Sequence, residues 1–170
     1  MSDSSEAADN MRISTKGDYA TRALQDLAFH YGSGPIPIEK IAGRQSLPVR
    51  YLEQLLLTLK RAGLLQSKRG VNGGYSLAKS PDQITLGEIL RSVDGPIEPI
   101  YCLGEAPRDQ CAQETACALR EVWGEVHRAV TEIVDRTTLQ DVCDRSRAMA
   151  APPEGQNVSP PTEPAAQRPL

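Results

Sequence analysis

Three cysteines lie close together in the second half of the chain, at Cys102, Cys111 and Cys117. Thiolate sulfur is a soft ligand that binds zinc and iron–sulfur clusters. Structural zinc sites usually take their ligands in pairs two to four residues apart, and the gaps of eight and five residues here do not match that spacing. Iron–sulfur clusters accept wider gaps. The three residues are therefore predicted to bind an iron–sulfur cluster.

Three cysteines leave such a cluster one ligand short, which suits a sensor because small reactants can reach the iron. The alternative is a set of free thiols that oxidise to a disulfide. In either case the compartment is expected to be reducing, where cysteines act as ligands, sensors or core thiols. The fourth cysteine, Cys143, follows Leu139 and Val142 at apolar spacing, so it is predicted to be a buried core thiol.

Charge is divided unevenly along the chain. Residues 11–79 contain eleven Lys or Arg and four Asp or Glu, a net +7, whereas the remainder carries −10 and the whole chain −3. A basic half joined to an acidic half predicts that one face meets nucleic-acid phosphates. No stretch approaches the roughly 18 apolar residues of a membrane span, and residues 1–10 lack the apolar segment of a signal peptide. We therefore expect a cytoplasmic protein without a membrane partner.

The order of elements in the first half predicts a winged helix-turn-helix. Thr15 and Asp18 fit the cap of a first helix, and Gly63 fits the residue after a helix end. The glycine-rich run 69–74 reads as a hairpin turn between two strands. Helices are expected from about Thr15, over 38–44 and over 48–62, and strands over 64–68 and 75–78.

Helix 48–62 is expected to lie in the major groove of double-stranded DNA. Arg50 can bind guanine or phosphate, Gln54 adenine, and Glu53 cytosine, while the basic hairpin suits the minor groove or its phosphates. Tyr51 is favoured as a packing residue. A protein-interaction module without DNA function is the alternative. The expected DNA-binding residues are Arg50, Tyr51, Glu53, Gln54, Lys60, Arg69, Gly70, Gly73 and Gly74.

The second half supplies a candidate dimer helix. Apolar residues recur every three or four positions over 118–136, and one helix with such a stripe needs a partner, most simply its own copy. Neither a phosphate loop nor a nucleophile–base pair is present, so no enzyme is expected. The predicted fold is mainly α with a β-hairpin wing, divided into a disordered extension 1–10, a winged helix-turn-helix 11–80, a cluster loop and dimerisation helix 81–145, and a disordered Pro-rich tail 146–170.

Several motifs resemble the Rrf2 family. These are the run from Met11 to Ala20, the Tyr-Leu-Glu-Gln-Leu of 51–55, the Arg-Gly-Val-Asn-Gly-Gly-Tyr of 69–75, and the three-cysteine loop. The resemblance covers about residues 11–143. It implies a homodimeric winged-helix transcription factor, most often a repressor, that binds a [2Fe–2S] or [4Fe–4S] cluster on Cys102, Cys111 and Cys117. In that family, the residues matching Glu53 and Arg69 contribute to operator choice and groove insertion.

The resemblance also bears on the fourth ligand. Cluster-assembly regulators of the IscR type place a histidine three residues after the last cysteine, where this chain has Arg120. Nitric-oxide sensors of the NsrR type use an aspartate from the partner subunit, and Asp18 occupies the matching position. The first cysteine gap is also longer than the usual five residues. The resemblance thus implies sensing of iron–sulfur status or of oxidative or nitrosative stress. The alternative is a cluster-free DNA-binding regulator that responds through thiol oxidation or a partner protein.

Overall fold

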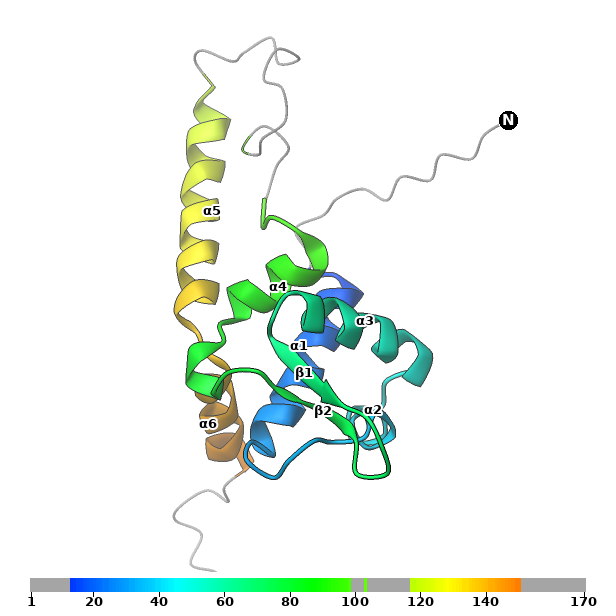
Figure 1. Ribbon diagram of the computed structural model, residues 1–170. Coiled ribbons are helices and arrows are strands. Elements are labelled where there is room, and N and C mark those ends of the chain that lie inside the picture. Colours follow the sequence, from blue (N-terminus) through cyan, green and yellow to red (C-terminus); the bar gives the residue numbers. More distant parts are fainter. Residues whose placement is uncertain (1–12, 99–102, 104–116, 151–170) are drawn as a thin grey trace, which may run out of the picture.

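The computed structural model describes residues 13–98, 103 and 117–150. These ranges form a mainly helical body with a two-stranded antiparallel hairpin (Figure 1). The predicted fold class is therefore confirmed. The elements in chain order are α1 (Thr15–Phe29), α2 (Ile38–Gln45), α3 (Val49–Arg61), β1 (Leu65–Lys68), β2 (Gly74–Leu77), the 3-10 helix η1 (Pro81–Gln83), α4 (Leu86–Asp94), α5 (Ala118–Arg136) and α6 (Leu139–Ala150).

Helix α1 forms the centre of this body and contacts α2, α3, α4, α6 and β2. Its inward face includes Ala20, Ala23 and Leu24, all fully buried. Alanines allow neighbouring helices to approach closely, and the larger neighbours then fill the space between them. The side chains packed into this core from other elements include Ile41, Leu52, Leu56, Leu59, Ile89, Leu139 and Cys143.

The start of α1 differs from the prediction by one residue. Ser14, not Thr15, is the cap, and its Oγ accepts a hydrogen bond of 3.0 Å from the backbone N–H of Gly17. Ser14 has the extended backbone that a cap requires, whereas Thr15 is already helical. The predicted Thr15–Asp18 cap is therefore wrong. Ser14 Oγ also donates to Asp94 Oδ1 at 2.6 Å, so the start of α1 is bonded to the end of α4.

The helix-turn-helix consists of α2, a tight turn and α3. Ser46 makes the turn in a left-handed conformation with φ of 54°. The sequence predicts a helix that begins at Pro48. In the structure Pro48 is the cap, and α3 begins one residue later at Val49. Helix α3 buries a stripe of leucines, and Gly63 follows the helix with φ of 77°, as its predicted role requires. The buried residues of α3 are Leu52, Leu55, Leu56 and Leu59.

An ion pair fixes α2 against α1. The carboxylate of Asp26 is only 4% exposed and accepts two hydrogen bonds from Arg44, at 2.7 Å from Nε and 2.6 Å from Nη2. The two-point contact sets the orientation as well as the distance of the two helices. The carboxylate also raises the pKa of Arg44, so the guanidinium stays charged.

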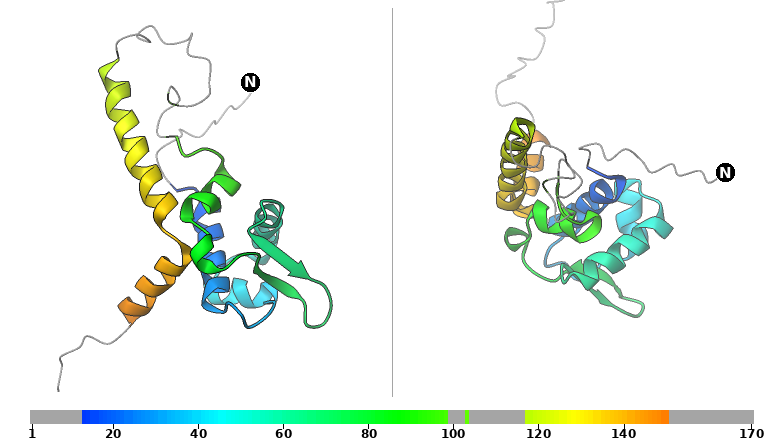
Figure 2. Two further views of the ribbon diagram at one scale, coloured as in Figure 1. Left: turned by 60° about the vertical axis from the view of Figure 1, so that its left-hand side comes forward. Right: turned by 90° about the horizontal axis from the view of Figure 1, so that it is seen from above.

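The wing is a short hairpin joined to the segment before α2. Strands β1 and β2 pair Leu65 with Leu77 and Lys68 with Gly74. Ile36 and Tyr75 exchange two backbone hydrogen bonds of 2.8 Å each, which adds a third chain segment to the sheet. The hairpin loop projects away from α5 and α6 (Figure 2).

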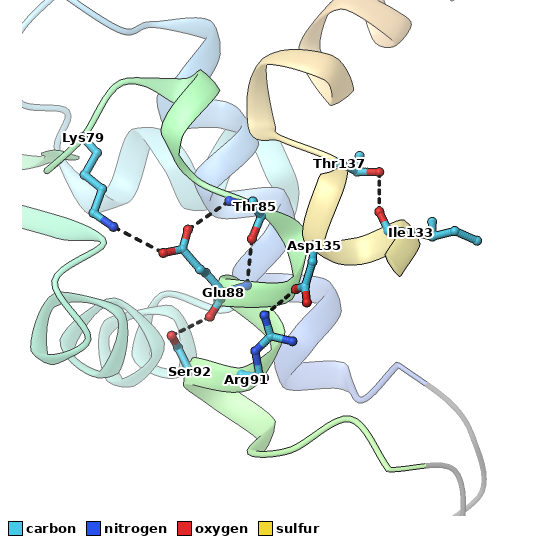
Figure 3. A network of polar contacts seen from close by, with 8 residues as sticks. All are labelled: Lys79, Thr85, Glu88, Arg91, Ser92, Ile133, Asp135 and Thr137. Atoms are coloured by element: carbon cyan, nitrogen blue, oxygen red, sulfur yellow. Dashed lines mark hydrogen bonds and ion pairs between the residues drawn. The ribbon is translucent and has the colours of Figure 1, made fainter. Parts of the chain in front are cut away.

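Helix α4 is anchored at its N-terminal end. Thr85 and Glu88 form a capping box, and Glu88 also contacts Lys79 (Figure 3). The backbone N–H of Leu86 donates to the carbonyl of Thr137 at 2.9 Å, and Arg91 pairs with Asp135 of α5. These contacts fix the α5–α6 junction against the body.

Helix α5 has the predicted bounds of 118–136 and extends away from the body beyond α4 (Figures 1 and 2). Helix α6 continues beyond the end of α5 at an angle to it (Figure 2) and packs on α1, where Cys143 is 1% exposed, so the predicted buried thiol is confirmed. The expected start of the tail at 146 needs correction, because α6 continues to Ala150. Ser146 accepts a hydrogen bond of 2.8 Å from Gln25, which ties this last part of α6 to α1.

We predict that Arg44→Ala lowers the free energy of unfolding by roughly 2–3 kcal/mol. Breaking a fully buried pair costs about 3–5 kcal/mol, and Arg44 itself is 36% exposed, which reduces the loss. Lys79→Ala is the control, because its exposed pair with Glu88 contributes only about 0.2–1 kcal/mol. Urea unfolding at one fixed protein concentration measures both. Equal losses in the two variants would contradict the assigned role of Asp26 and Arg44.

Candidate nucleic-acid interface and cysteine site

The outward face of α3 carries the predicted base-reading residues. Arg50, Glu53 and Gln54 are all exposed in the first two turns of the helix, while the leucine stripe faces the core. Side chains near the start of such a helix are the ones that reach base edges. Val49 and Leu57 are also exposed on α3, at 43% each. The exposed surface of α3 thus combines donors, an acceptor and apolar groups.

Tyr51 is half-buried, and its ring meets the ring of Tyr19 edge to face, with centroids 5.7 Å apart and planes at 87°. This geometry is favourable for an aromatic pair. Tyr51 therefore packs the start of α3 against α1, as favoured from the sequence.

The wing lies beside α3 and is bonded to it. Lys60 is exposed, and its Nζ donates to Ser67 Oγ of β1 at 2.6 Å. Burial raises the pKa of Tyr75 on β2, and the negative charge of Glu53 on α3 raises it further. Arg69 and Gly70 are exposed at the wing loop, whereas Gly73 and Gly74 are half-buried at its base. The structure thus brings the predicted DNA-binding residues together on α3 and the adjoining wing.

The cysteine site is described only in part, because Cys102 and Cys111 lie outside the described residues. Cys117 is a free, half-buried thiol at the cap position of α5. Helix α4 ends at Asp94 and helix α5 begins at Ala118, directly after Cys117, so the cysteine segment connects α4 to α5 in the chain. Within residues 13–98, 103 and 117–150 no cluster of three His, Cys, Asp or Glu side chains fits a metal ion.

Asp18, the candidate fourth ligand, lies in the first turn of α1 with its side chain 55% exposed. Its carboxylate contacts Arg22, one turn further along, at 3.6 Å. Arg22 also donates to the backbone carbonyl of Gln45, the last residue of α2. One guanidinium thus connects the candidate ligand to the end of α2, directly before the turn into α3.

Ser14 and Arg22 contact other elements from the part of α1 that carries Asp18, and neither contact is predicted from the sequence. Arg22 lies four residues after Asp18, and acid–base pairs at that spacing commonly meet on a helix surface. That spacing is the available signal for Arg22. Ser14 carries a cap signal of its own, but its bond to Asp94 joins residues 80 positions apart, which only the fold can reveal.

No helix in the described ranges combines the length and apolar character needed to cross a membrane.

Comparisons with known proteins agree with this architecture. A family model described as Rrf2, iron-dependent transcriptional regulator, matches residues 13–145. The regulator CymR of Bacillus subtilis is 42% identical over 132 residues, which is 78% of this chain and 89% of CymR. The solved structure of T. potens IscR is 35% identical with a TM-score of 0.68, covering 83% of this chain and 92% of IscR. The solved structure of the oxidized form of Staphylococcus aureus CymR is 33% identical with a TM-score of 0.63, covering 78% of this chain and 96% of that CymR chain.

These relatives are transcriptional regulators and not enzymes, and they share the hairpin-bearing helical fold described above. The family match spans the described body from the start of α1 into α6. The chain therefore belongs to the Rrf2 family of transcriptional regulators.

Proposed function

We propose that the chain is a cytoplasmic, homodimeric repressor whose affinity for operator DNA depends on an iron–sulfur cluster bound by Cys102, Cys111 and Cys117. The observation that carries the proposal is the position of the cysteine segment between two helices, α4 and α5, that are both bonded to the body. A change in this segment would act on the DNA-binding body and on α5 together. Membership of a family described as iron-dependent supports the same function.

The donor set suits such a cluster. Three thiolates are preferred ligands of iron–sulfur centres, and Cys117 is free and half-buried. Asp18 is exposed and contacts Arg22 in an exposed helix-surface pair, so its carboxylate is accessible to a second subunit as the fourth ligand. Arg120 stands where IscR-type regulators have a histidine, and a guanidinium does not ligate iron. When bound, the cluster would supply iron that reacts with oxidants or nitric oxide.

The proposed signal passes from Asp18 to the recognition helix through Arg22. If the Asp18 carboxylate is taken up as a ligand, Arg22 loses its nearest negative charge, and its remaining contacts include the carbonyl of Gln45. Gln45 ends α2 immediately before the left-handed turn into α3. Because Tyr19, the neighbour of Asp18, packs on Tyr51, the same turn of α1 also contacts the start of α3.

The proposed dimer forms through α5. Helix α5 has no buried residue, and Leu119, Val122 and Ile133 are 53–69% exposed along it. A 19-residue amphipathic helix gains stability by burying such a stripe against a second copy. Two recognition helices must then match half-sites about one DNA turn apart, roughly 34 Å. Small changes in the angle of α5 to α4 therefore alter the fit to the operator, and ligand state shifts the population between fitting and non-fitting forms.

A second candidate is a cluster-free regulator that binds DNA and responds through thiol oxidation. The similarity to CymR, including a structure of its oxidized form, and the free thiol of Cys117 favour it. In this case the cysteine segment would still connect α4 with α5, but disulfide formation would replace cluster binding as the event that alters it.

Replacement of Cys102, Cys111 and Cys117 by Ala separates the two candidates. After anaerobic reconstitution, we expect iron, sulfide and visible absorbance in the wild-type dimer and none in the triple variant, with operator affinity changing at least tenfold between the cluster-bound and cluster-free wild type. Cys143→Ala is the control, because that thiol is buried against α1 and should leave iron content unchanged. Native mass spectrometry reports dimer and cluster together.

Iron-free wild-type protein after reconstitution, with affinity that shifts on thiol oxidation, would replace the first candidate by the second. Affinity that ignores both iron and oxidation would contradict both.

Variants of Asp18 and Arg22 test the proposed signal path. Asp18→Ala should change the visible spectrum of the cluster while costing no more than about 0.5 kcal/mol of stability, the contribution of an exposed helix-surface pair. Arg22→Ala keeps the carboxylate and should leave the spectrum unchanged, yet reduce the difference in operator affinity between cluster-bound and cluster-free protein. An unchanged spectrum in Asp18→Ala excludes Asp18 as a ligand.

Salt titration tests DNA binding itself. Arg50→Ala and Arg69→Ala should weaken binding, and removing one phosphate-binding cation should reduce the slope of log affinity against log salt by about 1. Arg145 is exposed on α6, a helix that lies away from α3 and the wing, so Arg145→Ala should leave affinity and slope unchanged. Binding that is independent of salt in the wild type would argue for the protein-interaction module instead.

A further inference from the structure

The loop of the wing is a tight, well-defined turn. The backbone N–H of Gly73 donates to the carbonyl of Gly70 at 2.9 Å, which closes a four-residue turn with Val71 and Asn72 at its apex. A Cβ at Gly73 would collide with the backbone oxygen of Lys68, and one at Gly74 would collide with the backbone of Ile36. The chain is therefore packed backbone on backbone at the base of the loop, which fixes the direction of the apex.

The apex is also fixed relative to the recognition helix. Ile36 and Tyr75 hold β2 from one side through two backbone hydrogen bonds, and Lys60 of α3 holds β1 through Ser67. When α3 lies in a major groove, the position of the hairpin apex is thus determined by the fold.

Val71 is the most exposed large apolar residue among those described, with a relative exposure of 103%, and Asn72 beside it is exposed as well. A single exposed valine is ordinary on a protein surface. Here, however, the valine lies at a fixed apex next to two exposed cations, Lys68 and Arg69. Valine is stiff about its first side-chain torsion, so ordering it on contact with a ligand costs little entropy. The apex therefore presents a preformed apolar and amide surface beside phosphate-binding side chains.

We propose that Val71 and Asn72 select A·T base pairs in the minor groove beside each half-site. The minor groove of A·T pairs offers only acceptors, adenine N3 and thymine O2, whereas G·C adds the guanine 2-amino donor. The amide N–H₂ of Asn72 can donate to these acceptors. Val71 can pack on the C–H groups of the deoxyriboses, and the guanine amino group would occupy the space it needs. The narrow groove of A-tracts also favours the neighbouring cation of Arg69.

The assignment rests on the proposed DNA-binding function and adds to it two residues that choose sequence, beyond the groove insertion expected of Arg69. Base analogues separate minor-groove from major-groove reading. An inosine·cytosine pair has the minor-groove groups of A·T but the major-groove groups of G·C, and a 2,6-diaminopurine·thymine pair has the reverse combination.

The experiment uses the full-length dimer and an operator selected in vitro from random duplexes, with the wing positions located by hydroxyl-radical footprinting. The wild type should bind operators with A·T or inosine·cytosine at those positions with affinities that differ by no more than about twofold. Diaminopurine·thymine and G·C should bind roughly tenfold more weakly, as expected for a mismatched pair. The double variant Val71→Ala, Asn72→Ala should bind the four operators with affinities that differ by no more than about twofold. Met149→Ala, an exposed apolar residue on α6, is the matched control and should discriminate as the wild type does.

Three outcomes overturn the assignment. If no duplex is selected, the proposed DNA-binding function fails and the assignment fails with it. If an operator is bound but the double variant discriminates as strongly as the wild type, only the role of Val71 and Asn72 fails. If inosine·cytosine binds as weakly as G·C, the wing does not read the minor groove. Because both side chains are exposed, unfolding midpoints of the variants should equal that of the wild type.

Discussion

The close packing of four helices around α1 is the constraint on which the rest of the structure depends. Alanines at the fully buried positions 20 and 23 bring the neighbouring helices within reach of α1 on several sides. Helix α1 and its cap can then contact the ends of three other helices at once: the end of α4 through Ser14, the end of α2 through Arg22, and the start of α3 through Tyr19. A bulkier face on α1 would separate these contacts, because a close-packed core has no spare volume.

Two kinds of contact have different consequences in this arrangement. The Asp26–Arg44 pair has a buried carboxylate and two hydrogen bonds, so it fixes the geometry of α1 and α2. The Asp18–Arg22 pair is exposed and long, at 3.6 Å, so it can be exchanged for another contact at little cost. Under the proposed function both kinds have a use, because the surface of α3 must keep its shape while the contact at the proposed ligand Asp18 must be able to change.

The second half of the chain shows the same division. Helix α4 is bonded to the body at both ends and to the α5–α6 junction at its start. The exposed stripe of α5 is apolar and has no partner among the described residues of this chain. Motion of α5 as a unit about the bonded junction would alter its angle to the body without unfolding any helix, which is the kind of change a dimer could use to vary the spacing of its recognition helices.

The sequence by itself determined the type and order of α1, α2, α3, the β1–β2 hairpin and α5, since apolar spacing and Gly63 are local signals that act within a few residues. It located the bounds of α5, the buried thiol of Cys143 and the exposed residues of α3. It did not determine which residue caps α1, because Ser14 and Thr15 are both good caps and the bond from Ser14 to Asp94 comes from a distant helix. Nor did it determine the end of α6, where contact with Gln25 extends the helix past the expected start of the tail. The tertiary structure alone decided these points and the link from Asp18 through Arg22 to Gln45, because each depends on contacts between residues far apart in the chain.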